Sequence, residues 1–197
     1  MLDHYVAREI KVHFLPILAE VGTENSNFTS FEVKPTIFIY LHADTPNLLE
    51  SLRLLSKDFG IEGYIPNLPS AQLNALRFIG VNISEKPVQV SKVMAKSQLV
   101  ICHSGIGTVG HAIGLRKPLV LIPTQVEQSL LAHHLCLLGV AVSIPKTVST
   151  QQFVNTVKAV FDNREVMQTN IQLHRKESRD KSLVWKKDIN AFIDTFS

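Results

Sequence analysis

The stretch "QLVICHSGIGTVGHAIGLRKPLVLIP", residues 98–123, decides the fold. Its first part, Leu99 to Cys102, is a short continuous apolar run, which is typical of a parallel strand buried on both faces. A helical pattern follows from Thr108 to Leu115 and stops before Pro118. Leu119 to Ile122 is a second apolar run. The stretch therefore predicts a strand, a helix and a second parallel strand.

The turn between the first strand and the helix has the residues of an anion site. The first backbone N–H groups of a helix have no partner within it, and the helix dipole adds partial positive charge there. Gly105 and Gly107 let the main chain approach a ligand closely, and His103 adds a hydrogen-bond donor. The alternative is a tight turn that only joins strand to helix, because a short glycine motif is weak without its context.

Outward from this stretch, strand and helix patterns alternate along the chain. Strands are predicted at 35–41, 60–65, Phe78 to Ile83 and 140–145, and helices at 46–59, 69–76, Val90 to Ala95, 126–139, 149–161, 164–178 and 182–195. This alternation predicts an α/β fold, a Rossmann-like open and mostly parallel sheet flanked by helices. Such sheets bind ligands outside the carboxyl ends of their strands, where residues 103–108 are placed.

The chain of 197 residues is divided into three parts by these patterns. Residues 1–34 are predicted to be an N-terminal segment and linker, 35–180 a nucleotide-sugar-binding Rossmann-like domain, and 181–197 a C-terminal helix. The name of the middle part depends on the resemblance described below. One sizeable domain is what a chain of this length supports.

Composition excludes several classes of protein. With 45% hydrophobic and 19% charged residues, the chain is expected to be globular, and a net charge of +3 with scattered basic residues does not predict nucleic-acid binding. No apolar run approaches the roughly 20 residues of a membrane span, and the N-terminus lacks the core of a signal peptide. A cytoplasmic location is therefore expected. Cys102 and Cys136 suit buried, reduced thiols, and a disulfide is possible but not favoured.

The run "HSGIGTVGHAIGLRKPLVLIPTQVEQ" resembles the donor-binding signature of GT-B glycosyltransferases, in particular the macrolide and UDP-glycosyltransferase family. The residues that fall at the family's spacing are His103, Gly105, Gly107, Thr108, Pro118, Pro123 and Gln128, with Glu127 at an Asp position. "KPTIFIYLHAD" looks like the first strand of the family's C-terminal half. The resemblance covers most of the chain and implies the C-terminal half of a GT-B fold.

The resemblance also implies a role for each matching residue. The diphosphate of the donor is expected to lie against a set of five residues at the turn, which are His103, Ser104, Gly105, Gly107 and Thr108. His111 falls at the ribose-binding position, and Glu127 with Gln128 at the pair that contacts the sugar hydroxyls. The donor is expected to be a UDP- or TDP-linked sugar, with no metal and no other cofactor.

The chain departs from the family's pattern at several positions. His111 stands where the family has a ribose-binding Glu, and Ser104 replaces a Gly. The family's Gly-Ser or Gly-Thr loop after the first strand appears as His42 and Ala43, and an Asn of the sugar-binding segment appears as Leu131. A carboxylate can accept hydrogen bonds from both hydroxyls of a diol, whereas a neutral imidazole can accept only one. These departures affect donor identity and activity.

The leading hypothesis is the nucleotide-sugar-binding half of an inverting glycosyltransferase, which transfers a hexosyl group to an acceptor hydroxyl once joined to an acceptor-binding half. That half, whether an N-terminal domain or a separate partner chain, is expected to carry the catalytic base, so no catalytic residue is assigned here. The alternative is a non-catalytic, truncated or degenerate module, or a subunit that requires a partner chain. A nicotinamide oxidoreductase is disfavoured because "IYLHADTPN" lacks the Gly-x-Gly-x-x-Gly turn. A zinc site is disfavoured because no Cys-x-x-Cys pair is present.

Overall fold

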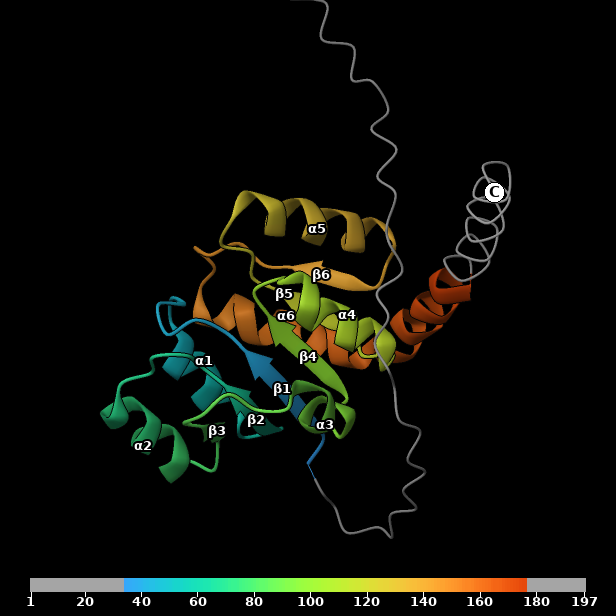
Figure 1. Cartoon of the computed structure of the whole chain (residues 1–197). Coiled ribbons are helices and arrows are strands. Elements are labelled where there is room, and N and C mark those ends of the chain that lie inside the picture. The colour runs from blue at the N-terminus through green and yellow to red at the C-terminus, as the bar shows by residue number, and fades with distance from the viewer. Residues whose placement is uncertain (1–33, 177–197) are drawn as a thin grey trace, which may run out of the picture. The chain divides into compact units, whose positions relative to one another are not determined.

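The computed structural model describes residues 34–176 of the chain, and those up to Arg175 belong to one compact unit. Six strands alternate with helices along this part of the chain (Figure 1). The strands are β1 (Thr36–Tyr40), β2 (Gly60–Tyr64), β3 (Asn82–Ser84), β4 (Leu99–Cys102), β5 (Leu119–Leu121) and β6 (Ala141–Ser143). The helices are α1 (Leu48–Leu55), α2 (Ser70–Phe78), α3 (Val90–Ala95), α4 (Ile106–Gly114), α5 (Val126–Leu137) and α6 (Thr150–Asp162), followed by helical residues 164–176.

The strands form one sheet in the order β3-β2-β1-β4-β5-β6, and all five pairs are parallel. The strand order therefore reverses its direction between β1 and β4, where Tyr40 pairs with Cys102. In an open sheet of this kind, the loops that leave the carboxyl ends of these two strands diverge to opposite sides and leave room for a ligand. The predicted Rossmann-like parallel sheet is confirmed.

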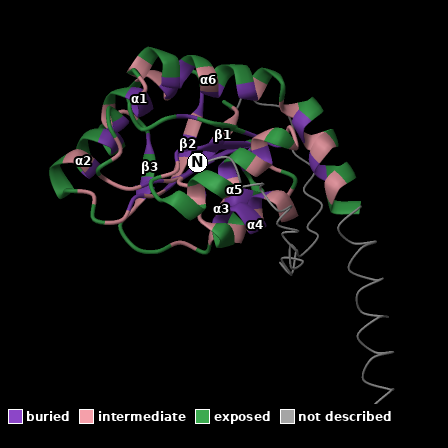
Figure 2. Cartoon of the chain, turned by 90° about the horizontal axis from the view of Figure 1, so that it is seen from above, coloured by how far each residue is buried: buried purple, intermediate pink, exposed green. Residues whose placement is uncertain are grey.

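Helices cover both faces of the sheet, so that the buried residues lie in the middle of a three-layer arrangement (Figure 2). Ile37, Ile39 and Ile101 pack in a core beneath α1, α2 and α6. Phe38, Val100 and other residues of β1, β4 and β5 pack in a second core beneath α3, α4 and α5. Because successive side chains of a strand point to opposite faces, only a continuous apolar run can fill both cores.

The helices form where apolar residues recur at helical spacing. In α1, Leu48, Leu52 and Leu55 are buried on one face, and the salt bridge of Glu50 with Arg53 lies on the exposed side. The start of α6 is a capping box, in which Ser149 accepts from the backbone of Gln152 while the Gln152 side chain reaches back to Ser149. Within residues 34–176, no helix is both long and apolar enough to cross a bilayer.

The prediction of a strand from Phe78 to Ile83 is wrong for its first four residues. Phe78 is the last residue of α2 and is 93% exposed, and β3 begins only at Asn82. Gly80, with φ of +81°, separates the two elements, because few other residues adopt this conformation at low cost. The apolar run of Phe78 and Ile79 therefore continues a helix instead of opening a strand.

The start of α4 also differs from the prediction. The structure begins α4 at Ile106, two residues before the predicted start at Thr108, so that Gly107 lies inside the helix. The predicted N-terminal segment and linker, except for Lys34, and the predicted C-terminal helix over 181–197 lie outside the described residues.

Candidate anion-binding site

The candidate site is the N-terminus of α4, which follows directly on the carboxyl end of β4. Gly105 is the residue that precedes the helix, and as a glycine it offers no side chain to cap the helix. Ile106 and Gly107 are exposed in the first turn, and a Cβ built on Gly107 would meet no atom within 4 Å. Among residues 34–176, no side chain accepts a hydrogen bond from the first amides of α4, which is the arrangement that binds an anion at a helix start.

Ser104 makes the turn between β4 and α4 in a conformation that favours glycine. Its φ is +65°, and its side chain is buried with 1% exposure. The hydroxyl oxygen of Ser104 has no hydrogen-bond partner, although its atoms are buried. The backbone conformation at this position therefore favours glycine, the residue of the family signature. The serine at position 104 introduces both backbone strain and an unsatisfied hydroxyl group.

We expect Ser104→Gly to raise the free energy of unfolding by about 1 kcal/mol. A left-handed conformation costs a residue with a Cβ about 1–2 kcal/mol, and a buried unsatisfied hydroxyl adds to that cost, while the flexibility of glycine in the unfolded chain offsets part of the gain. Urea unfolding monitored by circular dichroism measures the change. A loss of stability in the glycine variant contradicts the assignment of strain to this turn.

His103 lies beside the start of α4, half-buried at the end of β4. Its Nδ1 is 3.2 Å from the carbonyl oxygen of Tyr40, and because that oxygen can only accept, Nδ1 carries the proton. Its Nε2 is 3.4 Å from the position that a Cβ on Gly105 would occupy. The second ring nitrogen of His103 therefore adjoins the first residue of the α4 turn.

Two aromatic rings, one from β1 and one from the loop after it, lie against the His103 imidazole. The ring of His42, from the loop after β1, lies 4.3 Å from it between centroids, and the ring of Tyr40 lies 5.2 Å away at an edge. Burial, followed by the neighbouring His42, lowers the pKa of His103 below its ordinary value, and the hydrogen bond to Tyr40 opposes this. In the free protein near neutral pH, His103 is therefore mainly neutral.

Two more predicted residues lie on α4 itself. Thr108 is buried with 8% exposure in the first turn, and His111, one turn later, is half-buried. The spacing of three residues places them on neighbouring positions of one helix face. Their roles toward a diphosphate and a ribose stay predictions.

Glu127 and Gln128 lie in the first turn of α5, which follows β5, the neighbour of β4. Glu127 is exposed. The Oε1 of Gln128 accepts hydrogen bonds from the backbone N–H and the hydroxyl of Thr124, at 2.9 and 3.0 Å. The side-chain carbonyl of Gln128 therefore stabilises its own loop. One amide N–H of Gln128 donates to the Oε1 of Gln125 at 3.5 Å, so the other amide N–H is the group best suited to contact a sugar.

The residues at the start of α4 and those at the start of α5 lie at the same end of the sheet, because both follow the carboxyl ends of β4 and β5, which are adjacent and parallel. The sheet also brings His42 there from the loop after β1. Sequence reasoning recognised His42 as a departure from the family's loop but gave it no role. The missing signal was the pairing of β1 with β4, which no local pattern specifies.

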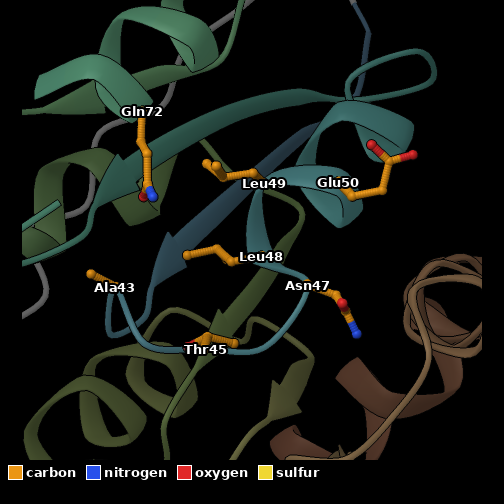
Figure 3. Close-up of a pocket in the computed structure, with 7 residues that line it drawn as sticks. All are labelled: Ala43, Thr45, Asn47, Leu48, Leu49, Glu50 and Gln72. Carbon is orange, nitrogen blue, oxygen red and sulfur yellow. The ribbon is translucent and has the colours of Figure 1, made fainter. Parts of the chain in front are cut away.

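The loop after β1 lies next to a shallow hollow of about 310 Å³, lined by residues of this loop, the start of α1 and α2 (Figure 3). Its lining residues are Ala43, Thr45, Asn47, Leu48, Leu49, Glu50 and Gln72. The hydroxyl of Thr45 donates to the carbonyl of His42 at 2.7 Å, and Asp44 pairs with Lys146 at 3.1 Å. These contacts hold the backbone of His42 in place.

The described residues contain no group of three or more His, Cys, Asp or Glu side chains that could hold a metal ion. Cys102 and Cys136 are both free thiols. Burial raises the pKa of Cys102 to about 12, so this thiol stays protonated at neutral pH.

Comparison with known proteins gives relatives of one kind. The NDP-glycosyltransferase YjiC of Bacillus subtilis (strain 168) is 36% identical over 92 residues, which are 44% of this chain and 23% of that protein. The structure of the glycotransferase of kitacinnamycin matches with a TM-score of 0.62 at 16% identity, over 81% of this chain and 43% of that one. The spinosyn rhamnosyltransferase SpnG matches with a TM-score of 0.60 at 17% identity, over 76% and 42%.

The chain spans less than half the length of each of these proteins. The structural matches, at low identity, support the fold alone, which is that of the C-terminal half of a GT-B protein. The model of the glycosyltransferase family 28 C-terminal domain matches residues 79–184, more than half of the chain, and includes β4, α4 and the turn between them. The chain therefore belongs to the glycosyltransferase family 28 C-terminal domain family.

Proposed function

We propose that the chain is the nucleotide-sugar-binding half of an inverting glycosyltransferase that transfers a hexosyl group to an acceptor hydroxyl. The observation that carries the proposal is the start of α4, where uncapped amides and the Nε2 of His103 adjoin one another. A diphosphate supplies the negative charge and the acceptor oxygens that these groups lack. The family of the chain and the relative in Bacillus subtilis support a glycosyl donor as the source of that diphosphate.

The remaining residues extend from the diphosphate in two directions. Ser104, Gly105, Gly107 and Thr108 form the turn that receives the phosphates with His103. His111, further along α4, is proposed to face the ribose, and Glu127 with Gln128 the sugar. A UDP- or TDP-linked sugar has the chemistry that this arrangement needs, and the proposal involves no metal and no other cofactor.

The proposed reaction is completed by an acceptor-binding half, either a preceding domain or a separate chain. A base on that half removes the proton of the acceptor hydroxyl, and the acceptor oxygen forms a bond to the anomeric carbon. The bond from that carbon to the diphosphate oxygen breaks on the opposite face, and its electron pair leaves with the diphosphate. The start of α4 and His103 stabilise the charge that develops on the leaving group.

Calorimetry of the full chain with UDP and TDP tests the proposal. Binding of either nucleotide with competition by its sugar conjugates supports a donor half. An absence of heat and of competition at millimolar nucleotide favours the second candidate, a non-catalytic module, which the replacement of a carboxylate by His111 already favours. Calorimetry of nucleotide binding therefore distinguishes a donor-binding half from a non-catalytic module.

We expect His111→Glu to tighten UDP binding about tenfold or more. A carboxylate accepts from both hydroxyls of the ribose, and charge-assisted hydrogen bonds contribute about 1.5–3 kcal/mol each. His111 is half-buried on α4, so the longer acidic side chain has access to solvent. Calorimetry gives the dissociation constants, and His133→Glu on the exposed surface of α5 controls for the change of net charge. Unchanged or weaker binding in His111→Glu shows that this position does not face the ribose.

A further inference from the structure

The two histidines that meet between β1 and β4 carry an inference beyond the donor site itself. His42 and His103 leave adjacent parallel strands, and their ring centroids are 4.3 Å apart with the planes tilted by 40°. The matching signature accounts for His103 but not for a second imidazole. The hydroxyl and the backbone N–H of Thr45 donate hydrogen bonds to the carbonyl of His42, at 2.7 and 3.1 Å. These bonds fix the backbone from which the His42 ring contacts His103.

The hydrogen bond to Tyr40 decides which proton His103 can offer. Because Nδ1 donates to a carbonyl oxygen, the neutral ring has its lone pair on Nε2, the nitrogen beside Gly105. A lone pair repels a phosphate oxygen. His103 can therefore donate to a diphosphate only after it takes up a proton at Nε2.

The contact with His42 opposes that proton in the free protein. Half-burial weakens the solvation of a charge on His103, and the adjacent His42 ring adds charge repulsion to this cost. A bound diphosphate reverses the balance, since its negative charges stabilise an imidazolium at the start of α4. Free and bound protein thus favour different protonation states of the same ring.

Other titratable groups lie around the pair on the neighbouring strands and loops. β1 contributes Tyr40, whose ring stacks on Tyr64 of β2, and β4 contributes the protonated thiol of Cys102. From the loops come Asp44, whose carboxyl pKa is lowered mainly by Lys146 and slightly by His42, and Lys146 itself, which pairs with it. The first turn of α4 has no titratable side chain.

We propose that His42 is a positioning residue of the diphosphate site, whose ring helps to keep His103 neutral against Tyr40 until the charge of a bound diphosphate stabilises a proton on His103. The proton comes from solvent and is bound at Nε2 of His103, where it donates to a phosphate oxygen. This inference rests on the proposed function, since it assumes that the start of α4 binds a diphosphate. It makes donor binding proton-coupled, with His42 setting the pH range.

The test is calorimetry of UDP binding to the full chain in buffers of different ionisation enthalpy, which measures the protons taken up. At about pH 6.5 we expect a larger net proton uptake in the unaltered chain than in His42→Gln, because the variant removes the repulsion from His42 while burial, the larger cause of the lowered pKa of His103, remains. The terminal phosphate of UDP titrates near the same pH and contributes equally to both proteins, so the difference between them reports on His103. Between the free and bound pKa of His103, the dissociation constant rises about tenfold for each unit of pH. NMR titration of the ring protons checks that the pKa of His103 in the free chain rises in His42→Gln.

The outcomes separate this inference from the proposed function. His133→Gln on α5 is the matched control and leaves the uptake unchanged, and His42→Asn replaces His42→Gln if that variant does not fold. An equal net proton uptake and an equal His103 pKa in the unaltered chain and the His42 variants overturn the inference and leave the donor site standing. Absence of UDP binding between about pH 5.5 and 8.5 overturns the proposed function and the inference with it.

Discussion

Gly63→Ala is expected to lower the free energy of unfolding by about 3 kcal/mol, at the upper end of what overpacking of a core costs. Gly63 lies in β2 opposite Ile39 of β1. A Cβ at this position would lie 2.0 Å from the carbonyl oxygen of Ile39 and 2.8 Å from its carbonyl carbon. These are backbone atoms of a central strand, so they cannot move aside without disturbing the β1–β4 pair as well.

Urea unfolding of the full chain, followed by circular dichroism, measures this loss. Gly107→Ala is the matched control, because a Cβ there meets no atom within 4 Å and alanine is favoured over glycine in a helix by up to about 1 kcal/mol. We expect the control to be at least as stable as the unaltered chain. A Gly63→Ala variant within 1 kcal/mol of the unaltered chain would show that β1 and β2 approach less closely than the structure has them.

His103→Ala is expected to weaken UDP binding by about 10- to 100-fold. The variant removes the only imidazole that the structure places both on the Tyr40 carbonyl and beside Gly105, within residues 34–176. A hydrogen bond from an imidazolium to phosphate contributes about 1.5–3 kcal/mol, which corresponds to this range. Because the amides at the start of α4 are unchanged, residual binding is expected.

Calorimetry at about pH 6.5 measures the loss, with His133→Ala as the control for removal of an exposed imidazole. Thermal unfolding of both variants shows whether the half-buried ring is needed for the fold. An affinity for UDP equal to that of the unaltered chain in a folded His103→Ala protein rules out this histidine as a phosphate ligand.

Local sequence was enough to predict most of the sheet. Leu99 to Cys102 is apolar at every position because both faces of β4 are covered, and such a run has few other interpretations beside a glycine turn. The prediction of a strand from an apolar run was wrong at Phe78, which is the last residue of α2 and has a solvent-exposed side chain. A short apolar pair next to a glycine fits either a helix end or a strand start, and tertiary packing decides between them.

The candidate site was predictable only where its residues are neighbours in sequence. Gly105 and Gly107 mark the α4 turn by their own conformational properties. His42 and His103 are brought together by the β1–β4 pair, which depends on strand order across the whole sheet. The contact of Gln128 with Thr124 is local in sequence. A Gln that stabilises a loop and a Gln that binds a sugar are nevertheless the same residue type, so the sequence could not distinguish the two roles.

The burial of Cys102 gives the chain a chemical reporter of its own. Alkylating reagents attack the thiolate, and a thiol with a pKa of about 12 at the end of a fully covered strand reacts only in molecules whose sheet has opened. With the half-buried Cys136 replaced by alanine, the rate of alkylation follows the opening of β4 alone. Nucleotide that slows this labelling stabilises β4, the strand that His103 follows, against opening.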